Sequence, residues 1–126
     1  MAARAITRAY DDALRSTGLR ATQVAVLAAV GARGAMSIKS LADSLEMDRT
    51  TLSRNLRPLE EHGYVRLAPE ARHRSRVLTL TSSGAEALQE ALPLWEEAQR
   101  RVKRRLGADS WQAVQGALSE LIEEVR

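Results

Sequence analysis

The chain has 126 residues, and 19 basic against 16 acidic side chains leave a formal charge of +3, with a pI near 9.9. This length predicts a single domain with one modest core. The absence of cysteine excludes disulfides, thiolate nucleophiles and cysteine-based metal sites. The longest apolar run is far shorter than the ~20 residues that span a bilayer, and no signal peptide opens the chain. We therefore expect a cytoplasmic protein with no membrane contact, no metal and no cofactor.

The positive charge is concentrated in the middle of the chain. Residues 48–81 carry seven arginines against four carboxylates, whereas residues 82–126 have a net charge of −2. The densest stretch holds Arg72, Arg74 and Arg76 at alternate positions, which puts all three on one side of an extended strand. Such a cluster in a small basic domain is typical of proteins that bind polyanions, and a solvated charged face is the alternative.

Apolar spacing predicts three helices in the first part of the chain. Residues 4–15 place apolar side chains at i, i+4, i+7 and i+8, the pattern of one buried stripe. Thr22 is expected to cap a second helix that ends near Gly31 or Gly34. Ser37 is expected to open a short third helix.

The next elements are a helix, a hairpin and a long helix. Asp48 caps a predicted fourth helix over residues 49–61. Residues 64–67 and 77–80 are predicted to be the two strands of a hairpin whose tip carries the basic stretch. Thr81 then caps a long fifth helix.

The closing segment carries an apolar seam with alternating spacings of three and four residues, which is a heptad pattern. Its members are Trp111, Val114, Leu118, Leu121 and Val125. A seam this regular indicates packing against other helices, either of the same chain or of a second copy.

Residues 38–57 have the pattern of a helix-turn-helix, which places its second helix where it can enter the major groove of DNA. At about 100° per residue, Thr50, Arg54 and Arg57 fall opposite the buried leucine stripe, and Thr51 and Ser53 flank them. Arginine can bind guanine edges in pairs of hydrogen bonds, and hydroxyls can meet bases or phosphates. A basic hairpin beside this helix can reach the minor groove, and Ser37 and Lys39 can hold a phosphate. The predicted DNA-binding residues are Ser37, Lys39, Thr50, Thr51, Ser53, Arg54, Arg57, Arg72, Arg74 and Arg76.

Taken together, residues 37–65, residues 74–84 and the closing helices resemble the MarR (multiple antibiotic resistance regulator) family. The most specific stretch reads DRTTLSRNLRPLEEHG and is followed by a basic wing and LTSSG. The resemblance covers essentially the whole chain. It departs from the family at the wing, which commonly reads Asp-x-Arg, because Arg72 occupies the aspartate position. Either Glu70, two residues away, replaces the aspartate, or the wing is looser and more basic.

The resemblance implies a mainly α fold: a winged helix-turn-helix with about six helices, a two-stranded wing and a helical dimerisation region from both termini. Residues 22–81 would form the DNA-binding part, and residues 1–18 and 82–126 the dimerisation part. The implied function is a sequence-specific regulator, a repressor, that binds a pseudo-palindromic operator as a homodimer. The implied dimer contacts are Ile6, Tyr10, Trp111, Val114, Leu118, Leu121 and Val125.

Family members often release DNA when a small aromatic compound binds, and Tyr10 and Trp95 are the candidate pocket residues here, with simple core packing as the alternative. A reactive-cysteine mechanism is excluded. Another function class remains as an alternative: a dimeric protein-interaction module that keeps the winged fold without specific DNA binding. A hydrolytic enzyme has little support, since neither histidine has an evident acid or nucleophile partner.

Overall fold

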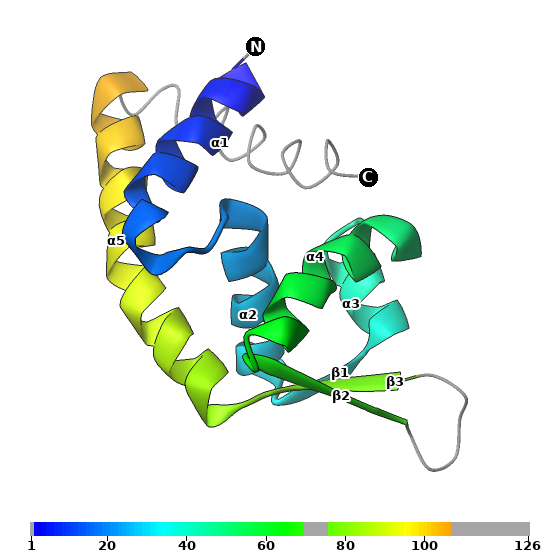
Figure 1. The fold of residues 1–126 in the computed structure, drawn as a ribbon. Helices are drawn as coiled ribbons and strands as arrows, with labels where there is room; N and C mark the ends of the chain where they lie inside the picture. Colours follow the sequence, from blue (N-terminus) through cyan, green and yellow to red (C-terminus); the bar gives the residue numbers. More distant parts are fainter. Residues whose placement is uncertain (1, 70–75, 107–126) are drawn as a thin grey trace.

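The structure is a computed structural model that describes residues 2–69 and 76–106 (Figure 1). The described part is mainly helical, as predicted, with a small antiparallel sheet. In chain order the elements are α1 (Ala2–Ala13), the 3-10 turn η1 (Arg15–Thr17), α2 (Ala21–Arg33), β1 (Ala35–Ser37), α3 (Ile38–Ser44), α4 (Arg49–Glu61), β2 (Val65–Pro69), β3 (Arg76–Leu80) and α5 (Ser82–Leu106). The predicted closing helix with its heptad seam, and the wing residues Arg72 and Arg74, lie outside the described residues.

Side-chain caps start the two helices of the helix-turn-helix at the predicted residues. The Ser37 hydroxyl accepts a hydrogen bond from the Ser40 amide at 3.0 Å and so begins α3. Asp48 begins α4 in the same way. The prediction that Thr22 caps α2 is wrong, because α2 begins at Ala21 and Thr22 lies inside its first turn.

The sheet has three strands in the order β1-β3-β2, rather than the predicted two. The additional strand, β1, covers only three residues and pairs with β3, with Met36 opposite Leu78. Both of these side chains are buried, so β1 fastens the wing to the helical core. The strand β1 is not predicted from the sequence, because three residues are too few to show the alternating apolar pattern of a strand.

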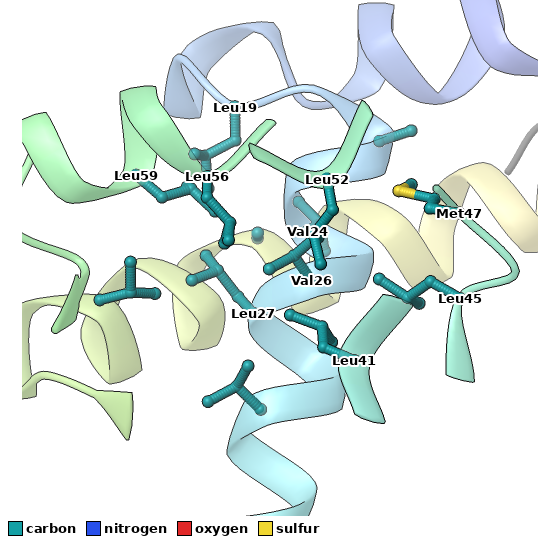
Figure 2. Packing of buried hydrophobic residues seen from close by; sticks show 14 of the residues in the cluster. Leu19, Val24, Val26, Leu27, Leu41, Leu45, Met47, Leu52, Leu56 and Leu59 are labelled. Atoms are coloured by element: carbon teal, nitrogen blue, oxygen red, sulfur yellow. The ribbon is translucent and has the colours of Figure 1, made fainter. Parts of the chain in front are cut away.

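One hydrophobic core joins the helices around α2. Figure 2 shows Val24 and Leu27 of α2 among leucines from the neighbouring elements, including Leu41 of α3 and Leu52 and Leu56 of α4. Each of these side chains is buried. Burial of a leucine-sized side chain contributes about 1.5–3 kcal/mol, so this cluster fixes α3 and α4 on α2.

The first helix lies beside the far half of α5 (Figure 1), where the Tyr10 and Trp95 rings pack with their centroids 4.5 Å apart. A carboxylate of α1 also connects it to α2. The Ala21 amide donates a hydrogen bond of 2.8 Å to Asp11 Oδ1, which satisfies one of the amides that a helix start leaves unpaired. The start of α2 is therefore closed by Asp11 of α1 and, locally, by the Gln23 side chain, which accepts a hydrogen bond of 2.9 Å from the Arg20 amide, rather than by Thr22.

The helices α3 and α4 end in the same hydrogen-bonded motif with different residues at its left-handed position. In α4 this position is Gly63, with φ of +75°, and the Tyr64 amide donates to the Leu59 carbonyl. In α3 it is Glu46, with φ of +56°, and the Met47 amide donates to the Ala42 carbonyl. The motif normally takes glycine, because a side chain in the left-handed region crowds the backbone.

We predict that Glu46→Gly raises the free energy of unfolding by about 1 kcal/mol, because it removes the left-handed strain in the turn of the helix-turn-helix. The reverse type of change, Gly63→Ala, should lower it by a similar amount. Urea denaturation of the two variants measures both. A Glu46→Gly protein less stable than the parent would show that the Glu46 side chain stabilises the turn more than its backbone conformation costs.

Candidate nucleic-acid interface

The orientation of α4 is set by its first turn and by three leucines. Asp48 Oδ1 accepts a hydrogen bond of 2.7 Å from the Thr51 amide, which fixes where the helix begins. Leu52, Leu56 and Leu59 are buried against the core and hold one side of the helix inward. The opposite side of α4 consequently faces solvent.

Four predicted residues come together on that outer side. Thr50, Ser53, Arg54 and Arg57 are all exposed, and together they line one open hollow of about 400 Å³. No salt bridge or side-chain hydrogen bond within the described residues engages Arg54 or Arg57. Their guanidinium groups are therefore available to phosphates and base edges, which are acceptors that arginine binds well.

Thr51 does not belong to this surface, and its prediction as a DNA-contacting residue is wrong. It is only 2% exposed and points into the core side of the helix. Its role is structural: the Thr51 amide donates to the Asp48 cap, and its carbonyl accepts a hydrogen bond of 2.9 Å from Asn55 Nδ2. A position at the edge of the helical wheel can turn either way, and here the neighbouring helices bury it.

A polar contact ties α4 to α2 beside the leucine core. The Thr22 hydroxyl donates to Asn55 Oδ1 at 3.1 Å, and Thr22 is buried. Because Asn55 also donates to the Thr51 carbonyl, its amide joins both helices. The helical spacing of Asn55, between the buried and exposed sides of α4, is a signal from which this contact could have been expected.

The remaining predicted residues lie on the elements around α4. Lys39 is exposed in the first turn of α3, while Ser37 is half-buried and its hydroxyl donates to that of Ser40. Arg76 is exposed at the start of β3, where the wing leaves the sheet. Sequence reasoning missed two further exposed cations, Arg49 at the first position of α4 and Arg66 on β2.

The salt bridges in which both partners belong to the described residues lie at the α1–η1 end and within α5. Asp12 pairs with Arg15 at 2.7 Å, and Glu97 lies within 4 Å of three arginines of α5. Hydrogen bonding from Arg100 is the main reason that the pKa of Glu97 falls below its usual value. By contrast, none of the described basic residues of α3, α4, β2 and β3 has a salt bridge. Their charged ends are therefore not engaged by a carboxylate of the described residues.

Two predicted dimer contacts need correction. Ile6 is 7% exposed and Tyr10 is fully buried, so both pack inside the chain and present no surface to a second copy. Tyr10 fills the space beside Trp95, which is the core-packing alternative for these predicted pocket residues.

The Tyr10 hydroxyl has no hydrogen-bond partner in the described structure. Burial raises the pKa of this phenol, and a polar contact with the Gln99 side chain, outside hydrogen-bond geometry, opposes part of that rise.

A second hollow, of about 460 Å³, lies between α1 and the far end of α5. Its apolar lining is formed by Ala9, Ala13, Ala98 and Val102, and its polar lining by Asp12, Arg101, Arg104 and Arg105. This surface differs from the outer side of α4, because its apolar floor suits a helix or another hydrophobic partner.

Other site types find no support in the described ranges 2–69 and 76–106. No helix there is both long and apolar enough to cross a membrane. No three histidine, aspartate or glutamate side chains in these ranges are grouped so that they could hold a metal ion.

Comparisons with known proteins agree on one family. A family model described as "MarR family" matches residues 17–74. The structure of the M. tuberculosis transcriptional regulator MosR in complex with DNA has 36% sequence identity, covers 98% of this chain and 89% of its own, and superposes with a TM-score of 0.82. No curated protein matches the sequence.

Two more distant structures share the fold. A mutant MarR from E. coli complexed with operator DNA has 21% identity, with 94% of this chain and 86% of that chain covered and a TM-score of 0.79. A MarR-family regulator from Rhodococcus sp. RHA1 has 20% identity, with 93% and 84% covered and a TM-score of 0.77. The mainly helical winged architecture predicted from the sequence is thereby confirmed.

We predict that Tyr10→Phe preserves or raises the free energy of unfolding, by about 1 kcal/mol or less, because it removes a buried hydroxyl without a partner. Tyr10→Ala should lower it by about 3–5 kcal/mol through the cavity it leaves. Because the folded state raises the phenol's pKa, the parent should lose stability as pH rises above 10, where the unfolded tyrosine ionises.

Chemical denaturation of the parent and Tyr10→Phe at pH 7 and above pH 10 tests both statements. The stability difference between the two proteins should move in favour of Tyr10→Phe at high pH. A clear loss of stability in Tyr10→Phe at pH 7 would mean that the hydroxyl makes a stabilising hydrogen bond.

Proposed function

This chain belongs to the MarR family, and we propose that it is a sequence-specific transcriptional regulator that binds duplex DNA. The proposal depends on one observation: α4 presents Thr50, Ser53, Arg54 and Arg57 on a single solvent-facing side, with both arginines free of ion pairs in the described structure. An α-helix of this kind fits the major groove, where arginine reads guanine and hydroxyls meet bases or phosphates.

The surrounding cations extend the proposed interface along the DNA. Lys39 and Ser37, at the start of α3, would hold a backbone phosphate and set the register of α4. The wing arginines Arg72, Arg74 and Arg76 would reach the adjacent minor groove, where narrow A·T-rich segments attract arginine. Arg49 and Arg66 add sequence-independent charge at the edges.

We further propose a homodimer on a pseudo-palindromic operator, with residues 22–81 as the DNA-binding part and residues 1–18 and 82–126 as the dimerisation part. The basic-rimmed hollow between α1 and α5 supports this arrangement. Residues 107–126 carry a heptad seam and four carboxylates against one arginine, so their charge complements that rim. Two recognition helices in such a dimer would lie about 34 Å apart, one turn of B-form DNA.

Repression is the proposed effect, because a dimer bound over a promoter obstructs transcription by occupancy alone. The proposed release mechanism, which the family resemblance implies, is binding of a small aromatic compound near Tyr10 and Trp95. These rings pack against each other here, so they would have to separate to admit it, and the packing of α1 on α5 would change. The proposed location is the cytoplasm, and no cofactor or enzymatic activity forms part of the proposal.

A protein-interaction module of the same fold is the competing function. Such a module has no need for an outer α4 side composed of hydroxyls and of arginines without a salt bridge in the described residues. The salt dependence of binding distinguishes the two functions. The affinity for DNA falls steeply as the salt concentration rises, because phosphate contacts release counterions, whereas contacts between proteins release no such counterions.

We predict that Arg54→Ala weakens binding to the operator by about 1–3 kcal/mol and relaxes base preference at one position, because a base-reading hydrogen-bond pair is lost. The matched control is Arg15→Ala, which removes the same charge from an arginine already paired with Asp12. Fluorescence anisotropy on DNA upstream of the protein's own gene, at several salt concentrations, measures both effects. Equal binding by the two variants, or parent binding indifferent to sequence and salt, would favour the interaction module.

We predict that Leu118→Asp shifts the protein towards monomer, because it places a charge in the heptad seam. Gln112→Asp introduces the same residue about 140° away from the seam on a helix and should leave the dimer intact. Sedimentation velocity distinguishes the two forms, and circular dichroism checks that the helices persist. A folded Leu118→Asp protein that remains dimeric would show that the seam packs within one chain.

A further inference from the structure

The start of α5 lies directly on the turn that ends α4. The Thr81 amide donates to the Tyr64 carbonyl at 3.0 Å, and the Thr81 hydroxyl donates to the Gly63 carbonyl at 2.5 Å. Gly63 and Tyr64 are the residues whose amides close the last turn of α4. Two hydrogen bonds therefore connect the end of the helix with the arginine surface to the beginning of the long helix.

Thr81 does more than begin its own helix. As an ordinary cap, it accepts a hydrogen bond of 3.0 Å from the Gly84 amide through its hydroxyl oxygen, and its carbonyl accepts from the Ala85 amide. These two contacts would suffice to start α5. The amide and the hydroxyl hydrogen, which a cap leaves free for water, instead bind the α4 turn, so every polar group of Thr81 is used.

Gly84 allows this close approach. A Cβ atom at this position would lie 2.0 Å from the Tyr64 carbonyl oxygen and 2.9 Å from its carbon, which no side chain can occupy. The obstructing atoms belong to the backbone, so they cannot move aside as a flexible side chain would. The first turn of α5 thus contacts the α4 turn backbone to backbone, where packing is least deformable.

We propose that Thr81 and Gly84 are positioning residues that lock the start of α5 to the end of α4 and thereby set the direction of the recognition helix relative to α5. The mechanical part of this inference concerns the single chain. Its functional part rests on the proposed DNA-binding dimer: if α5 carries the dimer contacts, the junction determines how far apart the two recognition helices lie and hence which half-site spacing fits.

Thr81→Asp separates the two roles of the residue. A carboxylate caps a helix at least as well as threonine, so α5 should still form, but it has no proton to donate to the Gly63 carbonyl. Thr81→Ser keeps both the cap and the donor and is the matched control. Gly84→Ala tests the same junction through sterics, and if it does not fold, Thr81→Asp still decides.

The first measurement needs no DNA. Since the chain has no cysteine, Glu60→Cys on α4 and Glu90→Cys on α5, both at exposed positions, give two unique sites for spin labels. Labelled protein is mixed with excess unlabelled protein, so that distances within one chain dominate. The interspin distance distribution should broaden or shift in Thr81→Asp and remain at the parent's in Thr81→Ser. An unchanged distribution in Thr81→Asp would overturn the proposal.

The second measurement uses paired half-sites whose separation varies one base pair at a time. The parent and Thr81→Ser should prefer one spacing, and Thr81→Asp should lose that preference while binding a single half-site as the parent does. A uniform loss at every spacing and on the single half-site would show a general stability effect and overturn the functional part. If the parent binds no DNA, the proposed function fails, whereas the spin-label distances still decide whether the junction is rigid.

Discussion

The burial of one leucine stripe on α4 governs the rest of the described structure. Leu52, Leu56 and Leu59 have their lowest free energy against α2 and α3, away from water. Because the leucines fix which side of α4 faces the core, the opposite side faces solvent. Thr50, Ser53, Arg54 and Arg57 lie on that opposite side. The surface with chemical significance is thus a consequence of the packing behind it, and Figure 2 shows that packing from within the core.

The sequence predicts most helices well, because their signals are local. Asp48 and Ser37 cap within three residues of their partners, and apolar side chains recur every three or four positions. The failures all depend on residues distant in the chain. Thr51 is buried by the tertiary packing around α4, and the Ala21 amide of α2 is satisfied by Asp11 of α1. The strand β1 forms only because β3 returns beside it, so three residues of sequence could not predict it.

The candidate site follows the same division. The outer residues of α4 follow from helical periodicity, whereas the contact between Thr22 and Asn55 requires two helices to be placed side by side. The salt bridges differ between the two regions in a related way. Glu97 pairs with arginines of α5, whereas none of the described arginines on and around α4 has a salt bridge. Salt bridges within α5 suit a scaffold, and cations without a salt-bridge partner among the described residues suit a surface that meets a polyanion.

The hydrogen bond from the Ala21 amide to Asp11 has a practical consequence. The segment that would meet DNA draws the cap of its first helix, and part of the cover over its core, from residues that precede it in the chain. An excised fragment beginning at residue 20 would leave the Ala21 amide without that carboxylate and would expose apolar side chains of α2 to water. The proposed DNA-binding part therefore cannot be transferred to another protein by itself, and a graft would have to include α1.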